Sequence, residues 1–119
     1  LLGLIYHVEN PMDVMRLARA CTKSLCVIES QLTQQTQPIV HGLGQTGEFH
    51  ESKGSFAVQL ELGDNPLAST GRVLSLIPNR TALEQMAQVA NFDAVEFATP
   101  HADHNPQYVS GNRAVLFAS

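Results

Sequence analysis

The chain has 119 residues, of which 44% are hydrophobic and 15% are charged, and its net charge at neutral pH is −4. This length fits one domain and is too short for two. The basic residues form no stripe, so the segment is a poor surface for nucleic acid. No apolar run approaches the roughly 18 residues of a membrane helix. The apolar first residues lack the features of a signal peptide, and we expect no membrane partner.

The two cysteines, Cys21 and Cys26, indicate the expected compartment. One lies at the end of a predicted helix and the other inside a predicted strand. A disulfide between them is therefore not expected, and their spacing is not that of a metal site. Reduced, buried thiols are typical of cytoplasmic proteins, so the sequence predicts a cytoplasmic location.

The first segment, Leu1 to Ile5, is apolar and is predicted to be the end of a buried strand whose start is missing. A helix is predicted from Asn10 to Cys21. Asn10 suits the N-cap of that helix, and Pro11 suits its first position. The spacing of apolar residues predicts one buried stripe, made of Val14, Leu17, Ala18 and Cys21.

The run from Leu25 to Ile28 is continuously apolar, which predicts a strand covered on both faces in a parallel sheet. Glu29 closes this strand. Ligands of open α/β sheets bind just outside the carboxyl ends of the strands. Glu29 is therefore either a substrate-binding residue or a solvated strand end, and the sequence leaves both interpretations open.

The segment from Gln31 to Lys53 is polar and is predicted to be a long loop. Loops of this length usually serve as lids or binding loops, or are disordered. Residues 42–47 read Gly-Leu-Gly-Gln-Thr-Gly, a formal match to the dinucleotide-binding fingerprint. That fingerprint needs a strand before it and an apolar helix that starts inside it. No helical stripe follows here, so these residues are interpreted as flexible loop glycines.

The stretch from Phe56 to Leu62 alternates apolar and polar residues, which is typical of a half-exposed strand. A turn at residues 63–66 follows. The stretch from Val73 to Ile77 is predicted to be a second strand that pairs with the first. With the preceding loop these strands are expected to form an insertion, residues 31–77, that covers the site.

A second helix is predicted from Asn79 to Ala90. Asn79 is its N-cap, and Asn91 follows at the left-handed position that ends many helices. Its apolar stripe is Leu83, Met86, Ala87 and Ala90.

Two strands are predicted at the end of the chain, from Ala94 to Ala98 and from Arg113 to Ala118. The polar connection between them, residues 100–111, contains no predicted helix. Two strands joined in this way are expected to form an antiparallel pair at the sheet edge.

Four segments in this order resemble the C-terminal half of a class I S-adenosylmethionine-dependent methyltransferase. They are Gly3-Leu4-Ile5-Tyr6-His7 with Asn10-Pro11, then Val27-Ile28-Glu29-Ser30, then Pro78-Asn79 with Ala82-Leu83 and Ala90-Asn91-Phe92, and finally Arg113 to Ala118. The subgroup that the chain resembles most comprises the enzymes that transfer a carboxymethyl group to the wobble uridine of tRNA. Asn91 stands where the family has glycine, and asparagine also tolerates that conformation.

The resemblance implies an α/β fold, a partial Rossmann-like methyltransferase sheet of mixed strands with an antiparallel terminal pair and a β insertion. Residues 1–119 would be the C-terminal part of one domain. The half that carries the glycine-rich cofactor loop would be absent, and this segment alone is expected to be inactive. The implied activity is methyl transfer from S-adenosylmethionine to a small molecule or a tRNA nucleoside. A homodimer is also considered.

The resemblance also assigns roles to individual residues. Tyr6 and Arg113 occupy the positions that hold the cofactor's additional carboxylate in the carboxymethyl-transferring subgroup, and arginine suits a carboxylate because it can bind in bidentate fashion. His7 is the candidate general base, since imidazole titrates near neutrality. The candidate sets are cofactor-binding Leu4, Tyr6 and Arg113, catalytic His7, and substrate-binding Glu29 and Asn79.

Each assignment has a structural alternative. Tyr6 would otherwise be a core ring, Arg113 a surface ion pair, His7 a structural histidine and Asn79 a helix cap. A metal-dependent hydrolase is a further alternative, in which the metal ligands would be His101 and His104 with His41 or His50. The spacing of these histidines is not that of a helical metal motif, so we expect no metal site. A non-catalytic, methyltransferase-like interaction or dimerisation module is the alternative function.

Overall fold

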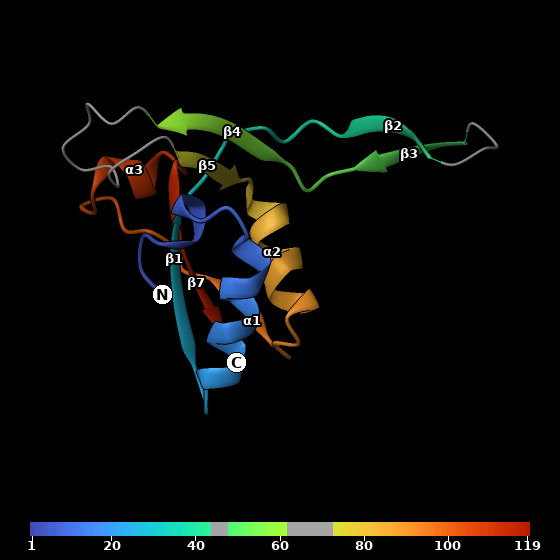
Figure 1. Ribbon diagram of the computed structural model, residues 1–119. Coiled ribbons are helices and arrows are strands. Elements are labelled where there is room, and N and C mark those ends of the chain that lie inside the picture. Colours follow the sequence, from blue (N-terminus) through green and yellow to red (C-terminus); the bar gives the residue numbers. More distant parts are fainter. Residues whose placement is uncertain (44–47, 62–72) are drawn as a thin grey trace.

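The computed structural model describes residues 1–43, 48–61 and 73–119, which fold as an α/β protein with antiparallel sheets (Figure 1). The helices are the 3-10 helix η1 (Ile5–His7), α1 (Pro11–Cys21), α2 (Arg80–Val89) and α3 (Pro106–Val109). The strands are β1 (Cys26–Gln31), β2 (Ile39–Leu43), β3 (Glu48–Ser52), β4 (Phe56–Glu61), β5 (Val73–Pro78), β6 (Val95–Phe97) and β7 (Arg113–Ala118). Among the helices of the described residues, none has the length and apolar character needed to cross a membrane.

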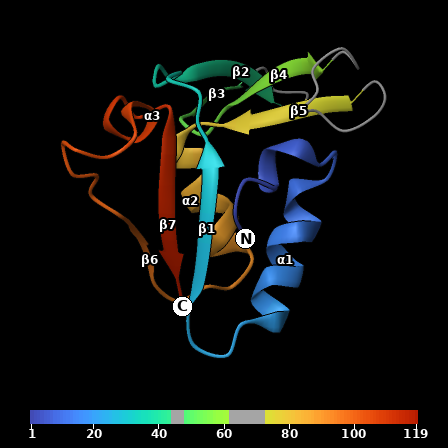
Figure 2. The same cartoon turned by 90° about the vertical axis from the view of Figure 1, so that its left-hand side faces the viewer.

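The main sheet has the strand order β1-β7-β6, with β7 antiparallel to both neighbours. The final pair, β6 and β7, is therefore antiparallel as predicted, with β6 at the edge and β7 between β6 and β1. Both longer helices, α1 and α2, lie on the same side of this sheet, and Figure 2 shows its other side facing the viewer. The core lies between the sheet and the two helices, where Met15, Ile28, Leu83 and Leu116 are fully buried.

The first residues run parallel to β1, but this extended segment is shorter than the predicted strand end, because Ile5 already lies in η1. A single parallel bridge joins Leu2 to Glu29. The backbone N–H of Gly3 donates to the carbonyl of Glu29 at 3.2 Å. Gly3 has a φ of +63°, a left-handed conformation that turns the chain out of the strand direction and into η1. The glycine therefore ends the strand before Ile5.

The prediction that β1 is covered on both faces in a parallel sheet was wrong. Its partner among the named strands is the antiparallel β7, its parallel contact is limited to the first residues of the chain, and the helices cover one face only. Ile28 points to the covered face and is fully buried, whereas Leu25 precedes the strand and is 57% exposed. The strand also continues to Gln31, because its last residues pair with Ala114 and Arg113 of β7.

The caps of both helices were predicted correctly. The predicted stripe of α1 was half right, because Val14 and Ala18 pack against the core whereas Leu17 and Cys21 are exposed. The side chain of Asn10 accepts a hydrogen bond from the N–H of Asp13, and Pro11 is the first helical residue. The buried face of α1 is centred on Met15, while Leu17 is 64% exposed. The stripe was partly misplaced because α1 touches the core with one side of its first turns and leaves its last turn, with Cys21, exposed.

The predicted stripe of α2 is confirmed, since all four of its residues are buried: Leu83, Met86, Ala87 and Ala90. The helix ends where predicted, because Asn91 takes the left-handed conformation with a φ of 68°. The connection 100–111 was predicted to contain no helix, and this prediction was wrong. The connection contains α3, which begins with an Asn-Pro pair in which Asn105 accepts from the N–H of Gln107.

The insertion contains two hairpins, β2–β3 and β4–β5, each an antiparallel pair. The second was predicted. The prediction of an unbroken loop from Gln31 to Lys53 was wrong, because β2 and β3 lie within it. In Figure 1 the β2–β3 hairpin projects from the body, and Ile39 and Val40 are exposed, so burial imposes no strand pattern there. Of the glycine-rich stretch, Gly42 lies in β2 and residues 44–47 lie outside the described part of the chain.

Candidate functional site

A cluster of polar side chains lies where β1 ends and β7 begins. Because these strands are antiparallel, Gln31 pairs with Arg113 and Glu29 pairs with Val115. Alternate residues of a strand share a face, so Glu29 and Arg113 project from the same face of the sheet. There Nη1 of Arg113 donates to Oε1 of Glu29 at 2.5 Å. The side chain of Glu29 is only 9% exposed and that of Arg113 is 25% exposed.

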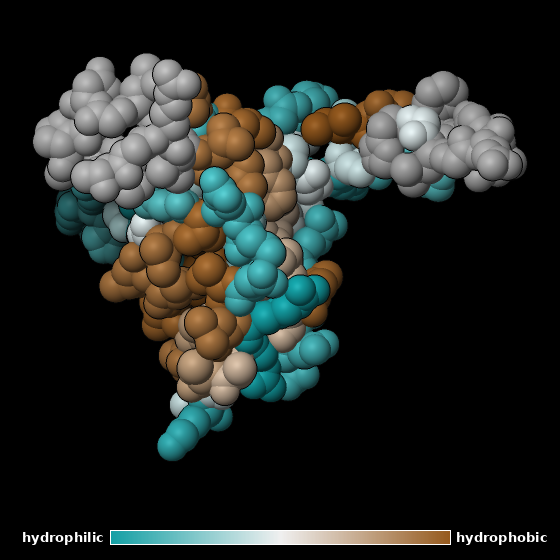
Figure 3. Space-filling model, viewed as in Figure 1, coloured by the Kyte–Doolittle hydropathy of each residue, from teal (hydrophilic) through white to brown (hydrophobic). Residues whose placement is uncertain are grey.

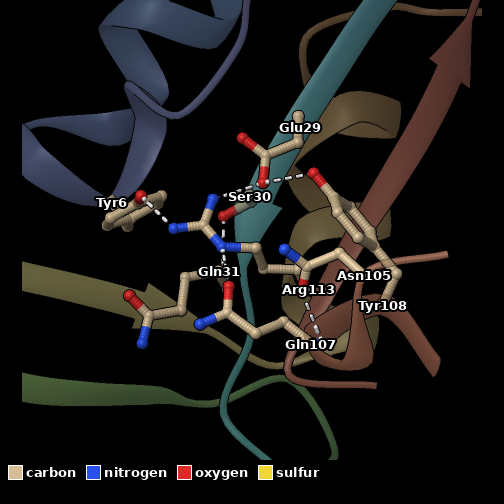
Figure 4. Close-up of polar contacts among 8 residues, drawn as sticks. All are labelled: Tyr6, Glu29, Ser30, Gln31, Asn105, Gln107, Tyr108 and Arg113. Carbon is tan, nitrogen blue, oxygen red and sulfur yellow. Dashed lines mark hydrogen bonds and ion pairs between the residues drawn. The ribbon is translucent and has the colours of Figure 1, made fainter. Parts of the chain in front are cut away.

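All three nitrogens of the Arg113 guanidinium have a side-chain partner (Figure 4). Nη2 donates to the hydroxyl of Tyr6 at 3.0 Å, and Nε donates to Oε1 of Gln107 at 2.7 Å. The guanidinium carbon also lies 5.6 Å from the centre of the Tyr6 ring. Arg113 therefore joins η1, β1 and α3, three segments that are far apart in sequence.

Tyr108 completes the cluster, because its hydroxyl donates to Oε1 of Glu29 at 3.3 Å. We call Tyr6, Glu29, Gln107, Tyr108 and Arg113 the Arg113 cluster. Gln107 and Tyr108 were missed by the sequence analysis. The signal for them was Asn105-Pro106, the same helix-opening pair as Asn10-Pro11, which places the first turn of α3 beside the start of β7.

The electrostatics of the cluster favour charged Arg113 and neutral Tyr108. Burial alone lowers the pKa of Arg113, but hydrogen bonds to Glu29 and Tyr6 outweigh it and raise that pKa above its ordinary value. The pKa of Tyr108 is raised above its ordinary value of 10.0, first by burial and then by the negative charge of Glu29. At neutral pH the cluster is therefore an arginine–glutamate ion pair flanked by phenols that donate or accept hydrogen bonds.

The structure places His7 beside the cluster and Leu4 at the surface. The rings of Tyr6 and His7 are adjacent in the chain, with centres 4.2 Å apart, and His7 is half-buried. Leu4 immediately precedes η1 and is 46% exposed. Tyr6, Glu29 and Arg113 are thus brought into one network, His7 adjoins that network through Tyr6, and Leu4 lies outside the polar contacts.

Asn79 lies at the start of α2 and its amide group is used by backbone partners. Its Oδ1 accepts from the N–H groups of Ala82 and Ser55 at 2.8 and 3.1 Å. Its Nδ2 donates to the carbonyls of Gln35 and Lys53, both at 2.7 Å. The residue is 3% exposed, and it fixes the positions of the loop after β1 and of the loop between β3 and β4.

A cavity of about 710 Å³ adjoins the Arg113 cluster. Residues from four segments line it, 32–36, 79–81, 98–111 and 113–117, together with Lys53. Arg113 and Tyr108 belong both to the cluster and to the cavity wall. Volumes of roughly 300–1,000 Å³ are typical of small-molecule sites, so the cavity has the size of a ligand site.

The histidine-containing loop forms a local turn. Nδ1 of His101 lies 3.3 Å from a carboxylate oxygen of Asp103, and the rings of His101 and His104 have centres 5.9 Å apart. Within residues 1–43, 48–61 and 73–119, no three histidine, cysteine, aspartate or glutamate side chains are grouped so that they could hold a metal ion.

The site thus offers an ion pair, two phenols and an adjoining imidazole, and Arg113 and Tyr108 connect this set to the cavity. Such a set is suited to binding a polar cofactor and accepting a proton. The chain matches no protein-family model, and comparison with curated proteins gives no match. The function of the site therefore has to be inferred from its own residues and geometry.

Proposed function

We propose that the chain forms the distal part of an S-adenosylmethionine-dependent methyltransferase domain. The observation that carries this proposal is the meeting of Tyr6, Glu29 and Arg113 in one network. Each was selected from a different sequence motif, and Tyr6 and Arg113 are separated by 107 positions in the chain. Three independently chosen residues have no general reason to converge, whereas residues of one binding site must do so.

The arrangement of the sheet supports the same proposal. The first residues run parallel to β1, with the bridge from Leu2 to Glu29 and a hydrogen bond of 2.9 Å from the N–H of Glu29 to the carbonyl of Leu1. The strands that follow β1 in the sheet are antiparallel to their neighbours. One parallel bridge beside antiparallel strands is in keeping with the mixed sheet that the resemblance implies.

The roles proposed for the site follow from what methyl transfer requires. The protein must hold the nucleophile in line with the sulfonium methyl group, exclude water and accept a proton where the acceptor loses one. His7, beside Tyr6, is the proposed base, and Tyr6 and Arg113 are the proposed cofactor-binding residues. Leu4, exposed ahead of η1, is proposed to add an apolar contact to the cofactor.

Glu29 bears on which cofactor is proposed. It already neutralises Arg113, so an additional carboxylate on the cofactor would meet a negative charge at the same guanidinium. We therefore propose unmodified S-adenosylmethionine. Both cysteines are free, in keeping with the proposed cytoplasmic location, but only Cys26 is buried as predicted and Cys21 is exposed. The net charge of −4 gives no support to a tRNA acceptor and favours a small molecule.

The experiment is calorimetric titration of S-adenosylmethionine into the protein in its full natural length, in parallel with its carboxylated form. The variants Tyr6→Phe and Arg113→Lys should weaken binding about tenfold, the effect expected for one charge-assisted hydrogen bond. Lys23→Gln, an exposed change in the turn before β1, is the matched control and should bind as the natural protein does. Absence of binding to the natural protein would contradict the proposal.

A second candidate function is a non-catalytic, methyltransferase-like module that forms a homodimer. The β4–β5 hairpin favours it, because one face carries the exposed apolar side chains Phe56, Val58, Leu60 and Leu74, between 41% and 66% exposed. Figure 3 shows apolar side chains gathered over this hairpin. Exposed apolar patches of this kind mark interaction sites, and an uncharged face suits a second copy of the same face.

Sedimentation equilibrium of the natural protein and of Val58→Glu tests this candidate. Val58 is 66% exposed, so the charge should be tolerated by the fold but not inside a dimer interface. A dimer that dissociates in Val58→Glu and persists in the control Val89→Glu, on the exposed side of α2, would support the module. A monomer at all concentrations would exclude it.

A further inference from the structure

The charge of the cavity wall is opposite in sign to that of the chain. The net charge of the chain is −4, with 11 acidic residues against 7 basic ones. Three basic side chains, those of Lys53, Arg80 and Arg113, line the cavity, and no aspartate or glutamate among the described residues lines it. Arg113 is neutralised by Glu29, which leaves Lys53 and Arg80 as the cations that set the charge of the wall.

Neither of these two cations has an acidic partner in the described part of the chain. The guanidinium of Arg80 lies over the Phe97 ring, with 3.9 Å between its central carbon and the ring centre. That stacking leaves the N–H groups at the edge of the guanidinium available for a ligand. Lys53 is exposed, and its ammonium group has three N–H donors. Two cations without acidic partners beside one cavity repel each other unless an anion lies between them.

Asn79 holds the two cations at the same wall. It binds the carbonyl of Lys53 at 2.7 Å and immediately precedes Arg80 in the chain. The same amide binds the carbonyl of Gln35 in the loop after β1, which forms the adjoining wall. The sequence predicts Asn79 as a substrate-binding residue. In this geometry Asn79 acts as a positioning residue, because it fixes the backbone from which Lys53 and Arg80 project.

We infer that this cavity binds a small molecule with an apolar body and one anionic group, a carboxylate or a phosphate, and that Arg80 and Lys53 recognise the anion. The body would contact the apolar part of the wall, which includes Leu32, Pro100 and Val109. The role of this ligand rests on the proposed function, in which the ligand is the methyl acceptor. Tyr108 and Arg113 belong both to this cavity wall and to the network that contains Tyr6, the neighbour of His7.

The volume decides between a small molecule and a macromolecule. A cavity of about 710 Å³ accommodates a molecule of drug-like size. An RNA strand would need a continuous basic groove, and the cavity offers two cations on a protein of net negative charge. The anion is therefore expected to belong to a compact molecule.

The experiment compares probes that differ in charge and little in shape. Benzoate, phenyl phosphate and neutral benzamide are titrated into the natural protein without S-adenosylmethionine, with amide chemical shifts recorded by NMR. At least one anion should bind and shift the amides of residues 33–36, 80–81 and 108–111, and benzamide should bind at least tenfold more weakly. Which anion binds tells a carboxylate ligand from a phosphate ligand.

Variants locate the recognition. Arg80→Gln and Lys53→Gln should each weaken the binding of the anion about tenfold, as for the loss of one charge-assisted contact. Arg80→Lys keeps the charge and should retain most of the affinity, and Lys23→Gln, which carries the same change of charge away from the cavity, should leave it unchanged. Both cations are exposed, so these variants should fold.

Two results would overturn the inference: benzamide binding as tightly as the anions, or anion binding that Arg80→Gln and Lys53→Gln leave unchanged. These outcomes are separate from failure of the proposed function, because the probes are titrated in the absence of the cofactor. A protein that binds benzoate through Arg80 but binds no S-adenosylmethionine would keep the anion site and lose the methyltransferase.

Discussion

Two polar clusters hold distant parts of this chain together, and they are built differently. The Asn79 cluster consists of one neutral amide and four backbone groups, from Gln35, Lys53, Ser55 and Ala82, around a residue that is 3% exposed. The Arg113 cluster consists of side chains alone, includes a full ion pair, and is open to the cavity.

The difference separates positions that build the fold from positions that are able to exchange partners. An amide bound to four backbone groups has no remaining hydrogen-bonding capacity, and its partners cannot move without moving the chain. Side-chain partners rotate about their own bonds, so Arg113 is able to release Tyr6 or Gln107 to a ligand at modest cost.

Asn79→Ala should lower the free energy of unfolding by about 3 kcal/mol, because it removes the cap of α2 and leaves buried backbone groups without partners. Urea unfolding followed by circular dichroism measures this. Asn10→Ala is the control, since Asn10 caps α1 at an exposed position and should cost about 1 kcal/mol. Equal losses in the two variants would show that Asn79 contributes only as a cap and that its hydrogen bonds to Gln35, Lys53 and Ser55 add no stability.

Arg113→Gln should lower the free energy of unfolding by about 2 kcal/mol, because Glu29 would remain 9% exposed with no cation. The partial exposure of Arg113 reduces the loss below that of a fully buried pair. Adding Glu29→Gln should recover part of the stability, and the double-mutant cycle should give a coupling of about 1 kcal/mol. Additive effects would mean that the ion pair contributes no more than its separate side chains.

The same contrast explains how much the sequence could predict. Asn79 and the stripe of α2 are local signals, a cap and a 3.6-residue period, and both were predicted correctly. Glu29 was identified because it was predicted to end its strand, although β1 continues to Gln31. Gln107 and Tyr108 were missed because α3 has four residues and no buried stripe, so only the Asn105-Pro106 pair marked it. The β2–β3 hairpin was missed because exposed residues such as Ile39 and Val40 carry no burial pattern.

Gly3→Ala should test whether the first residues deliver Tyr6 to the cluster. A φ of +63° costs an alanine about 1 kcal/mol, whereas its Cβ would meet Oε2 of Glu29 at an ordinary 3.4 Å. The variant should lose about that much stability and weaken the binding of S-adenosylmethionine more than the control Gly42→Ala does. Gly42 lies in β2, where a Cβ would meet nothing within 4 Å. Equal effects would show that Gly3 has no role in placing Tyr6.

Tyr108→Phe should have the smallest effect at neutral pH, about 0.5 kcal/mol for one long hydrogen bond to Glu29. The loss of stability caused by Tyr108→Phe should become smaller as the pH rises above 10. Burial and the charge of Glu29 raise the pKa of Tyr108 above 10.0, so the folded protein holds the phenolic proton more tightly than the unfolded chain does. This contribution is fully present below pH 10 and is lost as the pH rises through the folded-state pKa.

The natural protein should therefore lose more stability in alkali than Tyr108→Phe does, and thermal melts across this range measure the difference. The chain has two tyrosines and no tryptophan, so in Tyr6→Phe the phenolate absorbance reports Tyr108 alone. Its titration should lie above pH 10.0 in the folded protein and fall back towards that value in urea. A phenol that titrates at its ordinary value while folded would mean that Tyr108 is not held against Glu29, and the Arg113 cluster would then end at Gln107.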